Sequence, residues 1–317
     1  MNSDNYFISC DWGTSNFRLR LIEKSTLRLV DSVQTNEGIK QLNQRFLEVG
    51  NGHRKAYFSA YLLEQAAKLA DVSSLPKIVI SGMASSNIGL AELPYGTTPF
   101  GEGLNGISYQ DIVLDDSSSA LLISGIRNER GVMRGEETQA LGLLGNLTKG
   151  QEAIVILPGT HSKHLEYSNG VYEGFRSFMT GELFQILSEK SILANNVEKC
   201  TWTVGRKRAF MEGIEVGYVS GLTNNIFSVR AKQLFGDMEK KDNYFYLSGL
   251  LIGDELSYLE KAPVNIVLAA TEPFYSLYEL ALISFMDTAR IRLLNEKELE
   301  KALILGQYKI LDHYGKQ

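Results

Sequence analysis

Two short polar turns, far apart along the chain, carry residue types that bind phosphate groups. The residues concerned are Gly13, Thr14 and Ser15 in the first turn and Gly159, Thr160, His161, Ser162 and Lys163 in the second. Glycine lets the backbone approach a ligand closely, and neighbouring amide N–H groups form a nest for anions. The hydroxyl groups add donors, and Lys163 adds a positive charge. Both turns therefore predict contacts to the phosphates of a nucleotide, with exposed hairpin turns as the alternative.

A carboxylate stands directly beside the first turn. Asp11 precedes Gly13 by two positions. Mg²⁺ in phosphate-transferring sites is usually held by one or two carboxylates together with water and phosphate oxygens. Asp11 is therefore the predicted metal ligand. The alternative is an Asx-turn residue that caps a hairpin.

A second acidic cluster, Arg134-Gly135-Glu136-Glu137-Thr138, lies at the expected start of a helix. A glutamate at this place could accept the proton of an attacking hydroxyl, and Arg134 could donate a forked pair of hydrogen bonds to a substrate carboxylate. Successive helical residues point about 100° apart, so only one of Glu136 and Glu137 can face a given point. Acidic residues that favour the helix dipole are the alternative explanation.

The two turns require strands that position them. Phe7–Cys10 is a short apolar run, and Phe17, Leu19 and Leu21 alternate with arginines, which is typical of a half-buried strand. The second turn follows the β-branched run 153–157, and Asn169-Gly170 predicts a type I′ hairpin turn after it. The two halves of the chain therefore begin alike, and we interpret this as an internal structural duplication.

Helices and strands alternate through the rest of the sequence. Helices are expected at 56–70, 136–147, 180–190, 248–260, 272–287 and 296–312, and strands at 77–81, 264–269 and 289–294. This alternation predicts an α/β protein. With 317 residues, two domains are expected, and we place their boundary near Gly145, giving domains 1–145 and 146–317.

Composition narrows the classes of function. Hydrophobic residues make up 44% and charged residues 22%, which is the mixture of a globular protein. The net charge of −5 gives no general attraction to nucleic acid or to anionic membranes, so neither is an expected partner. No apolar run approaches the roughly 20 residues that span a bilayer, and the first ten residues lack a secretion signal. A cytoplasmic location is therefore expected.

One motif matches a nucleotide-binding pattern in the wrong context. Residues 101–106 read G-x-G-x-x-G, but the segment follows a proline-containing loop and precedes a strand-like run at 107–114. A dinucleotide fold needs a strand before the glycines and a helix after them. The sequence also lacks the G-x-x-x-x-G-K-[ST] motif, which disfavours a P-loop kinase.

Several of these segments together resemble the 2-dehydro-3-deoxygalactonokinase family, within the sugar kinase, Hsp70 and actin superfamily. The matching segments are Asp11–Arg18, Ser81–Asn87, Ala91–Tyr95, Val132–Gln139, Leu157–Lys163, Met179–Leu183 and Leu247–Gly253. The resemblance implies a two-domain, ribonuclease H-like α/β fold with a duplicated core and an interdomain cleft. It also implies ATP- and Mg²⁺-dependent phosphorylation of 2-dehydro-3-deoxy-galactonate at its terminal C6 hydroxyl.

The resemblance also implies roles for single residues. Gly13, Thr14 and Ser15 with Asp11, and Gly159 to Lys163, would be the two phosphate motifs, meeting across the cleft, and Asp11 would bind Mg²⁺ through water. Gly135 to Thr138 is similar to a Gly-His-Asp-Thr segment of related kinases, which favours Glu137 over Glu136 as the base. The residues expected to contact the sugar acid are Arg18, Ser85, Ser86, Asn87 and Arg134. Ala270 stands in the adenosine segment where family members usually have glycine, so nucleotide binding could differ.

Two other functions stay open. A kinase of the same fold could act on a neighbouring sugar acid such as 2-dehydro-3-deoxygluconate, because one inverted hydroxyl changes few contacts. Alternatively, the chain could be a nucleotide-binding regulator without transfer activity, an idea motivated by Ala270. The expected partners are the small-molecule sugar acid and ATP, and any self-association is expected to give a homodimer.

Overall fold

The computed structural model describes residues 3–50, 52–71, 74–262 and 264–316. Internal contacts divide the chain into two compact units. Unit 1 comprises Met1–Lys149, Ser168–Gly174 and Leu299–Gln317, and unit 2 comprises Gly150–Tyr167 and Phe175–Glu298. The sequence predicted a division into 1–145 and 146–317; the contacts instead group the segments 168–174 and 299–317 with unit 1.

Unit 1 is built around a mixed sheet with the strand order β3-β2-β1-β4-β8-β7. Its elements are β1 (Tyr6–Trp12), β2 (Phe17–Glu23), β3 (Arg28–Thr35), α1 (Ile39–Val49), α2 (Arg54–Ala66), β4 (Ile78–Gly82), β5 (Gly96–Thr97), β6 (Phe100–Gly101), β7 (Tyr109–Val113), β8 (Ser119–Ile123), β9 (Ile126–Arg127), β10 (Val132–Met133), α3 (Glu136–Leu143) and most of α9 (Glu296–Tyr314), with short 3₁₀ turns at Ser3–Asn5, Met83–Ser85 and Leu144–Asn146. β1 is antiparallel to β2 and parallel to β4, and β4 is parallel to β8. The carboxyl ends of these parallel strands therefore share one edge of the sheet.

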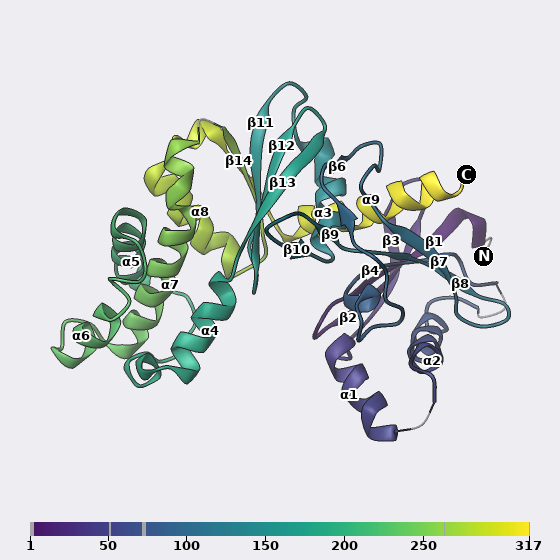
Figure 1. Ribbon diagram of the computed structural model, residues 1–317, viewed down its shortest axis with the longest axis horizontal. Coiled ribbons are helices and arrows are strands. Elements are labelled where there is room, and N and C mark those ends of the chain that lie inside the picture. Colours follow the sequence, from purple (N-terminus) through teal and green to yellow (C-terminus); the bar gives the residue numbers. More distant parts are fainter. Residues whose placement is uncertain (1–2, 51, 72–73, 263, 317) are drawn as a thin grey trace. The chain divides into compact units, whose positions relative to one another are not determined.

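Helices cover both faces of this sheet because β1 is apolar on both sides. Ile8, Cys10 and Trp12 pack in one cluster with residues of α1 and α2, which lie together on one side of the sheet (Figure 1). On the other face, the ring of Phe7 lies 5.9 Å from that of Tyr308 in α9. The buried Gln307 side chain, also in α9, donates hydrogen bonds of 2.9 Å to the Cys10 carbonyl and to the Ser81 hydroxyl. The C-terminal helix therefore belongs to the core of unit 1.

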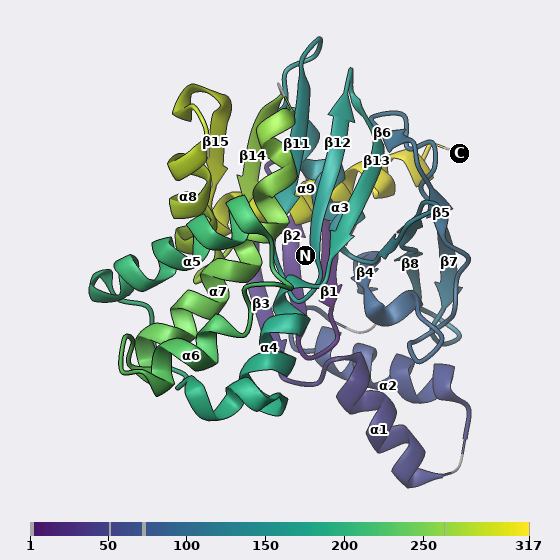
Figure 2. The same ribbon diagram turned by 60° about the vertical axis from the view of Figure 1, so that its left-hand side comes forward.

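Unit 2 contains most of a second sheet, with the strand order β15-β14-β11-β12-β13-β6; β6 and the residues of β13 that pair with it belong to unit 1 by their contacts. Its elements are β11 (Glu152–Leu157), β12 (Ser162–Ser168), β13 (Val171–Phe178), α4 (Thr180–Lys190), α5 (Lys207–Ser220), α6 (Ser228–Leu234), α7 (Lys240–Leu256), β14 (Asn265–Ala269), α8 (Phe274–Phe285) and β15 (Ile291–Leu294), with 3₁₀ turns at Ile192–Asn196, Val204–Arg206, Ser257–Lys261 and Thr288–Arg290. Figure 2 shows β14, β11, β12 and β13 side by side in this order. β14 is parallel to both β11 and β15.

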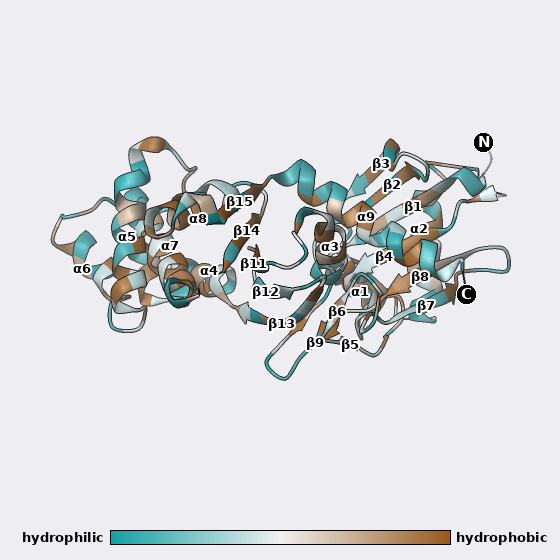
Figure 3. Ribbon diagram, turned by 90° about the horizontal axis from the view of Figure 1, so that it is seen from above, coloured by the Kyte–Doolittle hydropathy of each residue, from teal (hydrophilic) through white to brown (hydrophobic). Residues whose placement is uncertain are grey.

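The parallel strands of both units are apolar along their length because helices bury them on both faces. The hydropathy colours of β8 and β14 in Figure 3 show this property. In unit 2, Ile266 and Leu268 of β14 pack with Phe210 of α5 and Leu277 of α8. Each unit therefore has a core of its own.

The two units repeat one arrangement, as the sequence predicted. In each, a hairpin is followed by a third strand and a helix, and the first strand of the hairpin then pairs with a parallel strand later in the chain. The hairpin tip at 168–174 belongs to unit 1 by its contacts, since Val171 and Tyr172 pair with Gly101 and Phe100 of β6. Within the described ranges, no helix is both long and apolar enough to cross a membrane.

Candidate functional site

The first turn is a tight connection between β1 and β2. The Gly13 N–H donates to the Asn16 carbonyl at 2.9 Å, and Thr14 and Ser15 are exposed. The start of α1 supports the turn from behind, because the Ile39 N–H donates to the Gly13 carbonyl at 2.9 Å. A Cβ atom at Gly38 would overlap the Thr14 carbonyl. The turn is thus fixed in place while its hydroxyl groups face solvent.

Asp11 lies beside this turn and forms an ion pair across the hairpin. It stands opposite Arg18 in the register of β1 and β2, and the Arg18 Nη1 lies 3.4 Å from the Asp11 Oδ2. Both side chains are partly exposed, at 39% for Arg18 and 28% for Asp11. The pair therefore lies open to a ligand.

The start of α3 lies at the same sheet edge as Asp11. Asp11 pairs with Ser81 of β4, and Gly82 follows Ser81 directly. Gly135, directly before α3, has a φ of 105°, which favours glycine, and a Cβ built on it would lie 3.3 Å from the Gly82 Cα atom. The adjacent strands β1 and β4 and the start of α3 therefore bring Asp11 and the two glutamates to one edge of unit 1.

The two glutamates of α3 have different environments. Glu137 is fully buried; its Oε2 accepts the Gly135 N–H at 2.6 Å and its Oε1 accepts the Thr138 hydroxyl at 2.9 Å. Burial, together with the charge of Glu136, raises the pKa of Glu137 to about 7. Glu136 is partly exposed, and its Oε2 accepts the Arg134 N–H at 2.9 Å. In this structure a substrate hydroxyl could reach Glu136, whereas Glu137 is enclosed.

Arg134 is held by two neighbours from the segment after β4. Its Nη1 donates to the Ser85 carbonyl and, at 2.6 Å, to the Ser85 hydroxyl. Its guanidinium lies 4.3 Å from the centre of the Tyr95 ring. Two of the residues expected to contact the sugar acid, Arg134 and Ser85, thus lie in contact. The Ser86 hydroxyl instead donates to the Met83 carbonyl at 2.7 Å, and the exposed Asn87 accepts a hydrogen bond from Arg54 through its carbonyl.

The donor set beside the first turn fits a metal that arrives with a nucleotide. Among the residues that the structure describes, no group of three or more histidines, cysteines, aspartates or glutamates could enclose an ion. Asp11 is a single partly exposed carboxylate beside a turn rich in amides and hydroxyls. Mg²⁺ often takes only one or two protein carboxylates and completes its shell with water and phosphate. Asp11 therefore fits a magnesium ion that arrives with a nucleotide. It does not form a preformed site of the zinc type.

The second turn, between β11 and β12, has the same kind of support from the following helix. The Glu182 N–H donates to the Thr160 carbonyl at 3.0 Å, and a Cβ atom at Gly181 would lie 2.5 Å from the Gly159 carbonyl. The Glu182 side chain also binds the exposed His161 ring, with 2.6 Å between Oε2 and Nε2. The turn and the N-terminal end of α4 therefore form one packed unit.

The last two residues of the predicted second phosphate motif, Ser162 and Lys163, are the first residues of β12. Ser162 and Lys163 are both buried. The Ser162 hydroxyl donates to the Glu255 Oε1 at 2.7 Å, and the Lys163 ammonium donates to the His161 carbonyl at 2.9 Å. The part of the second turn that faces solvent is thus Thr160 and His161, beside the partly exposed Gly159.

Sequence reasoning missed a buried carboxylate beneath the second turn. Glu255 is 2% exposed and accepts hydrogen bonds from Ser162, His164, Thr180 and Tyr278. Burial alone would raise the pKa of Glu255, but its hydrogen bond and charge interaction with His164 and the hydroxyl donors lower it overall. The only local signal is the acidic pair Asp254-Glu255 near the end of α7, and the sequence does not reveal that Glu255 is the buried member of the pair.

Comparison with known proteins identifies the family. The model of the 2-keto-3-deoxy-galactonokinase family matches residues 11–304. The chain belongs to this family. A Rhizobium meliloti (strain 1021) protein provisionally named 2-dehydro-3-deoxygalactonokinase DgoK1 is 33% identical over 264 residues, covering 81% of each chain. The Escherichia coli (strain K12) 2-dehydro-3-deoxygalactonokinase is 28% identical over 262 residues, covering 79% of each chain.

A solved structure shares the fold. A Sinorhizobium meliloti protein with the same provisional family name superimposes with a TM-score of 0.81 at 29% identity, covering 96% of this chain and 99% of that one. The expected α/β fold is confirmed, and so is the prediction of a sugar-acid kinase of this family.

Ala270, predicted to lie in the adenosine segment, is part of the core of unit 2. It is 2% exposed, and it belongs to the apolar cluster that contains Leu268 and Tyr278. Its N–H donates to the Leu294 carbonyl at 3.2 Å. The methyl group therefore contributes to packing between the end of β14 and its surroundings.

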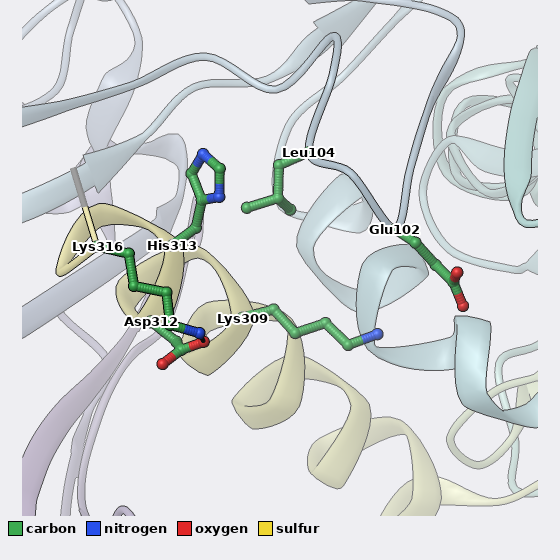
Figure 4. A pocket seen from close by; sticks show the side chains of 6 residues that line it. All are labelled: Glu102, Leu104, Lys309, Asp312, His313 and Lys316. Atoms are coloured by element: carbon green, nitrogen blue, oxygen red, sulfur yellow. Dashed lines mark hydrogen bonds and ion pairs between the residues drawn. The ribbon is translucent and has the colours of Figure 1, made fainter.

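The G-x-G-x-x-G loop contributes to a different feature of unit 1. As expected, it lies between strands, β6 and β7, rather than before a helix. A hollow of about 310 Å³ is lined by Glu102, Leu104, Lys309, Asp312, His313 and Lys316. Figure 4 shows these six side chains. Their ammonium groups are engaged: Lys316 pairs with Asp312 at 2.5 Å, and Lys309 donates to the Leu141 carbonyl at 3.0 Å. None of the residues predicted to act in catalysis or binding lines this hollow.

Proposed function

We propose that this protein transfers the γ-phosphoryl group of ATP to the terminal C6 hydroxyl of 2-dehydro-3-deoxy-galactonate, which gives the 6-phosphate. The observation that carries the proposal is the arrangement in unit 1, where Asp11, the first turn and the glutamates of α3 share one edge of the sheet. Membership in the family and the names of both curated relatives support this substrate.

The proton of the attacking hydroxyl goes to a carboxylate at the start of α3. The C6 oxygen forms a bond to the γ-phosphorus, the bond to the departing ADP oxygen breaks, and the hydroxyl proton is accepted by the base. Glu136 is our choice for direct contact because it is partly exposed, while Glu137 is enclosed by the Gly135 N–H and the Thr138 hydroxyl. The sequence favoured Glu137 as the base. Glu137 can take this role only if substrate binding opens its enclosure.

The phosphates are bound by backbone amides and hydroxyls. In this proposal Gly13, Thr14 and Ser15 in unit 1, and Gly159 to His161 in unit 2, donate hydrogen bonds to the β- and γ-phosphates. Mg²⁺, when bound with ATP, neutralises the charge that develops on the phosphate oxygens. Asp11 would hold that ion through water, a role that its partial exposure supports.

The sugar acid carries a carboxylate, and Arg134 is the proposed group that receives it. Guanidinium and carboxylate form paired, charge-assisted hydrogen bonds. The Ser85 and Tyr95 contacts hold the guanidinium in one orientation, which lowers the entropy lost on binding. Arg18 is a second proposed contact, since it lies beside Asp11 at the same edge. A cytoplasmic location and, where the chain self-associates, a homodimer complete the proposal.

The test is a coupled ADP-release assay on the purified full chain with ATP and Mg²⁺. The acceptors are 2-dehydro-3-deoxy-galactonate, its gluconate epimer and other aldonic acids. We expect the galactonate acid to have the highest kcat/KM, and Asp11→Asn and Glu136→Gln to lose at least about a hundredfold in kcat. A higher kcat/KM for the epimer would instead support the neighbouring substrate. ATP binding without turnover on any sugar acid would support the non-catalytic regulator.

A further inference from the structure

Glu255 connects the two sides of the second turn through a single buried carboxylate. Its Oε1 accepts the Ser162 hydroxyl at 2.7 Å and lies 2.8 Å from the His164 Nε2. Its Oε2 accepts the Thr180 hydroxyl, and the Tyr278 hydroxyl at 2.8 Å. These four partners come from β12, from the start of α4 and from α8.

The number of these contacts determines what the carboxylate can do. An ionised carboxylate offers about four lone-pair sites, and four groups of the protein bind Glu255. It is also 2% exposed, so neither a substrate hydroxyl nor a metal ion can reach it. Glu255 therefore cannot act as a base or a ligand in this structure, and its effect must pass through the residues that it holds.

Two of those residues border the second turn. Ser162 is the first residue after His161, and Thr180 directly precedes Gly181, which packs against the Gly159 carbonyl. Glu255 thus joins the end of the turn to the part of α4 that supports it. Loss of either hydroxyl contact would leave a buried charge short of one donor, and this penalty favours movement of the turn or of the helix start.

We infer that Glu255 is a positioning residue for the second turn: it fixes the spacing between the turn and the start of α4, so that the backbone amides of Gly159 to His161 are arranged in advance for the phosphates of a nucleotide. The inference rests on the proposed nucleotide-binding role of this turn. It predicts that damage to the Glu255 contacts weakens the binding of ATP much more than that of the sugar acid.

The test compares three variants of the full chain. Thr180→Val removes one donor to Glu255 and keeps the side-chain shape, and Glu255→Gln replaces one acceptor oxygen by an NH₂ group that meets two donors. The control is Asn243→Ala in the same helix, α7, which removes two buried hydrogen bonds, to the Asn196 and Val229 carbonyls. The readouts are the Kd of ATP by calorimetry, the KM values of both substrates and kcat, and the thermal unfolding midpoint.

We expect Thr180→Val and Glu255→Gln to raise the Kd and KM of ATP about tenfold, because each disturbs a hydrogen bond to a buried charge. The KM of the sugar acid should stay within about twofold. Asn243→Ala should lower the unfolding midpoint and leave the Kd of ATP within about twofold. If Glu255→Gln does not fold, Thr180→Val carries the test alone.

Three results would overturn the inference. The first is an unchanged Kd of ATP in Thr180→Val, and the second is an equal loss in Asn243→Ala, which would mean that general destabilisation is the cause. The third is a wild-type chain that does not bind ATP. A wild-type chain that binds ATP but phosphorylates no sugar acid would defeat the proposed function alone, since the binding comparison does not need turnover.

Discussion

The buried Glu137 should make the stability of unit 1 depend on pH. Burial and the charge of Glu136 raise its pKa from 4.5 to about 7. Between these two values the folded state keeps its proton while the unfolded chain loses it. The free energy of unfolding therefore falls as pH rises from below 4.5 through 7, because the folded state must then ionise a carboxylate that is out of water.

The size of this effect follows from the shift. Each pKa unit corresponds to about 1.4 kcal/mol, so this single group should lower the free energy of unfolding by about 2.5 kcal/mol between pH 5 and pH 8. Glu137→Gln removes the titration and keeps the shape. In Glu137 the Gly135 N–H and the Thr138 hydroxyl bind different carboxylate oxygens. The glutamine oxygen can therefore accept the Gly135 N–H, and its NH₂ group can donate to the Thr138 hydroxyl.

The two tryptophans make the measurement specific to unit 1. Trp12 is buried in the core of unit 1, and Trp202 packs against Phe210 and Phe245 in unit 2. In a Trp202→Phe background, urea unfolding followed by tryptophan fluorescence therefore reports the surroundings of Trp12. We expect the variant to gain about 2.5 kcal/mol on its parent between pH 5 and pH 8. Parallel pH profiles for the two chains would show that the raised pKa of Glu137 does not contribute to the stability of unit 1.

Three further substitutions test separate parts of the site. Asp11→Asn should lower kcat by about a hundredfold and change the free energy of unfolding by less than about 1 kcal/mol, since its ion pair is partly exposed; unchanged kcat would exclude Asp11 from metal binding. Gly181→Ala should weaken ATP binding in calorimetry, because the new Cβ would lie 2.5 Å from the Gly159 carbonyl, whereas Gly145→Ala, with nothing within 4 Å, should not. Equal binding in both would show that the second turn tolerates movement. Arg134→Lys should raise the KM of the sugar acid about tenfold through loss of the forked hydrogen bonds, and leave the KM of ATP unchanged; a rise in the KM of ATP alone would contradict this role.

The sequence was most informative where local pattern determines structure. The alternation of Phe17, Leu19 and Leu21 with arginines predicted β2, and the β-branched run at 153–157 predicted β11. β3 was not predicted, because its side chains are mostly exposed and give no alternating pattern. α7 begins at Lys240, eight residues before the predicted start at Ser248. Its first turn, 240–243, is polar in sequence, and the aromatic residues that follow are fixed by packing in the core.

The candidate site also contains residues that the sequence predicted and residues that only the fold reveals. The turns and the Arg134 to Thr138 cluster are short continuous motifs, so their residue types alone predicted phosphate binding and acid–base chemistry. Glu255 could not be assigned from spacing, because Ser162 and Thr180 lie 93 and 75 positions away in the chain. Likewise, burial separates the environments of Glu136 and Glu137, and no local pattern reveals which of two adjacent acidic residues is enclosed.

The identity of the reaction product decides whether the C6 hydroxyl is the phosphoryl acceptor. The full chain would be incubated with ATP, Mg²⁺ and 2-dehydro-3-deoxy-galactonate, and the product examined by phosphorus–proton correlation NMR. We expect a new phosphomonoester whose phosphorus couples to the two protons on C6, formed in equal amount to ADP. A phosphomonoester at another carbon, or ADP formed without any phosphorylated sugar acid, would contradict it.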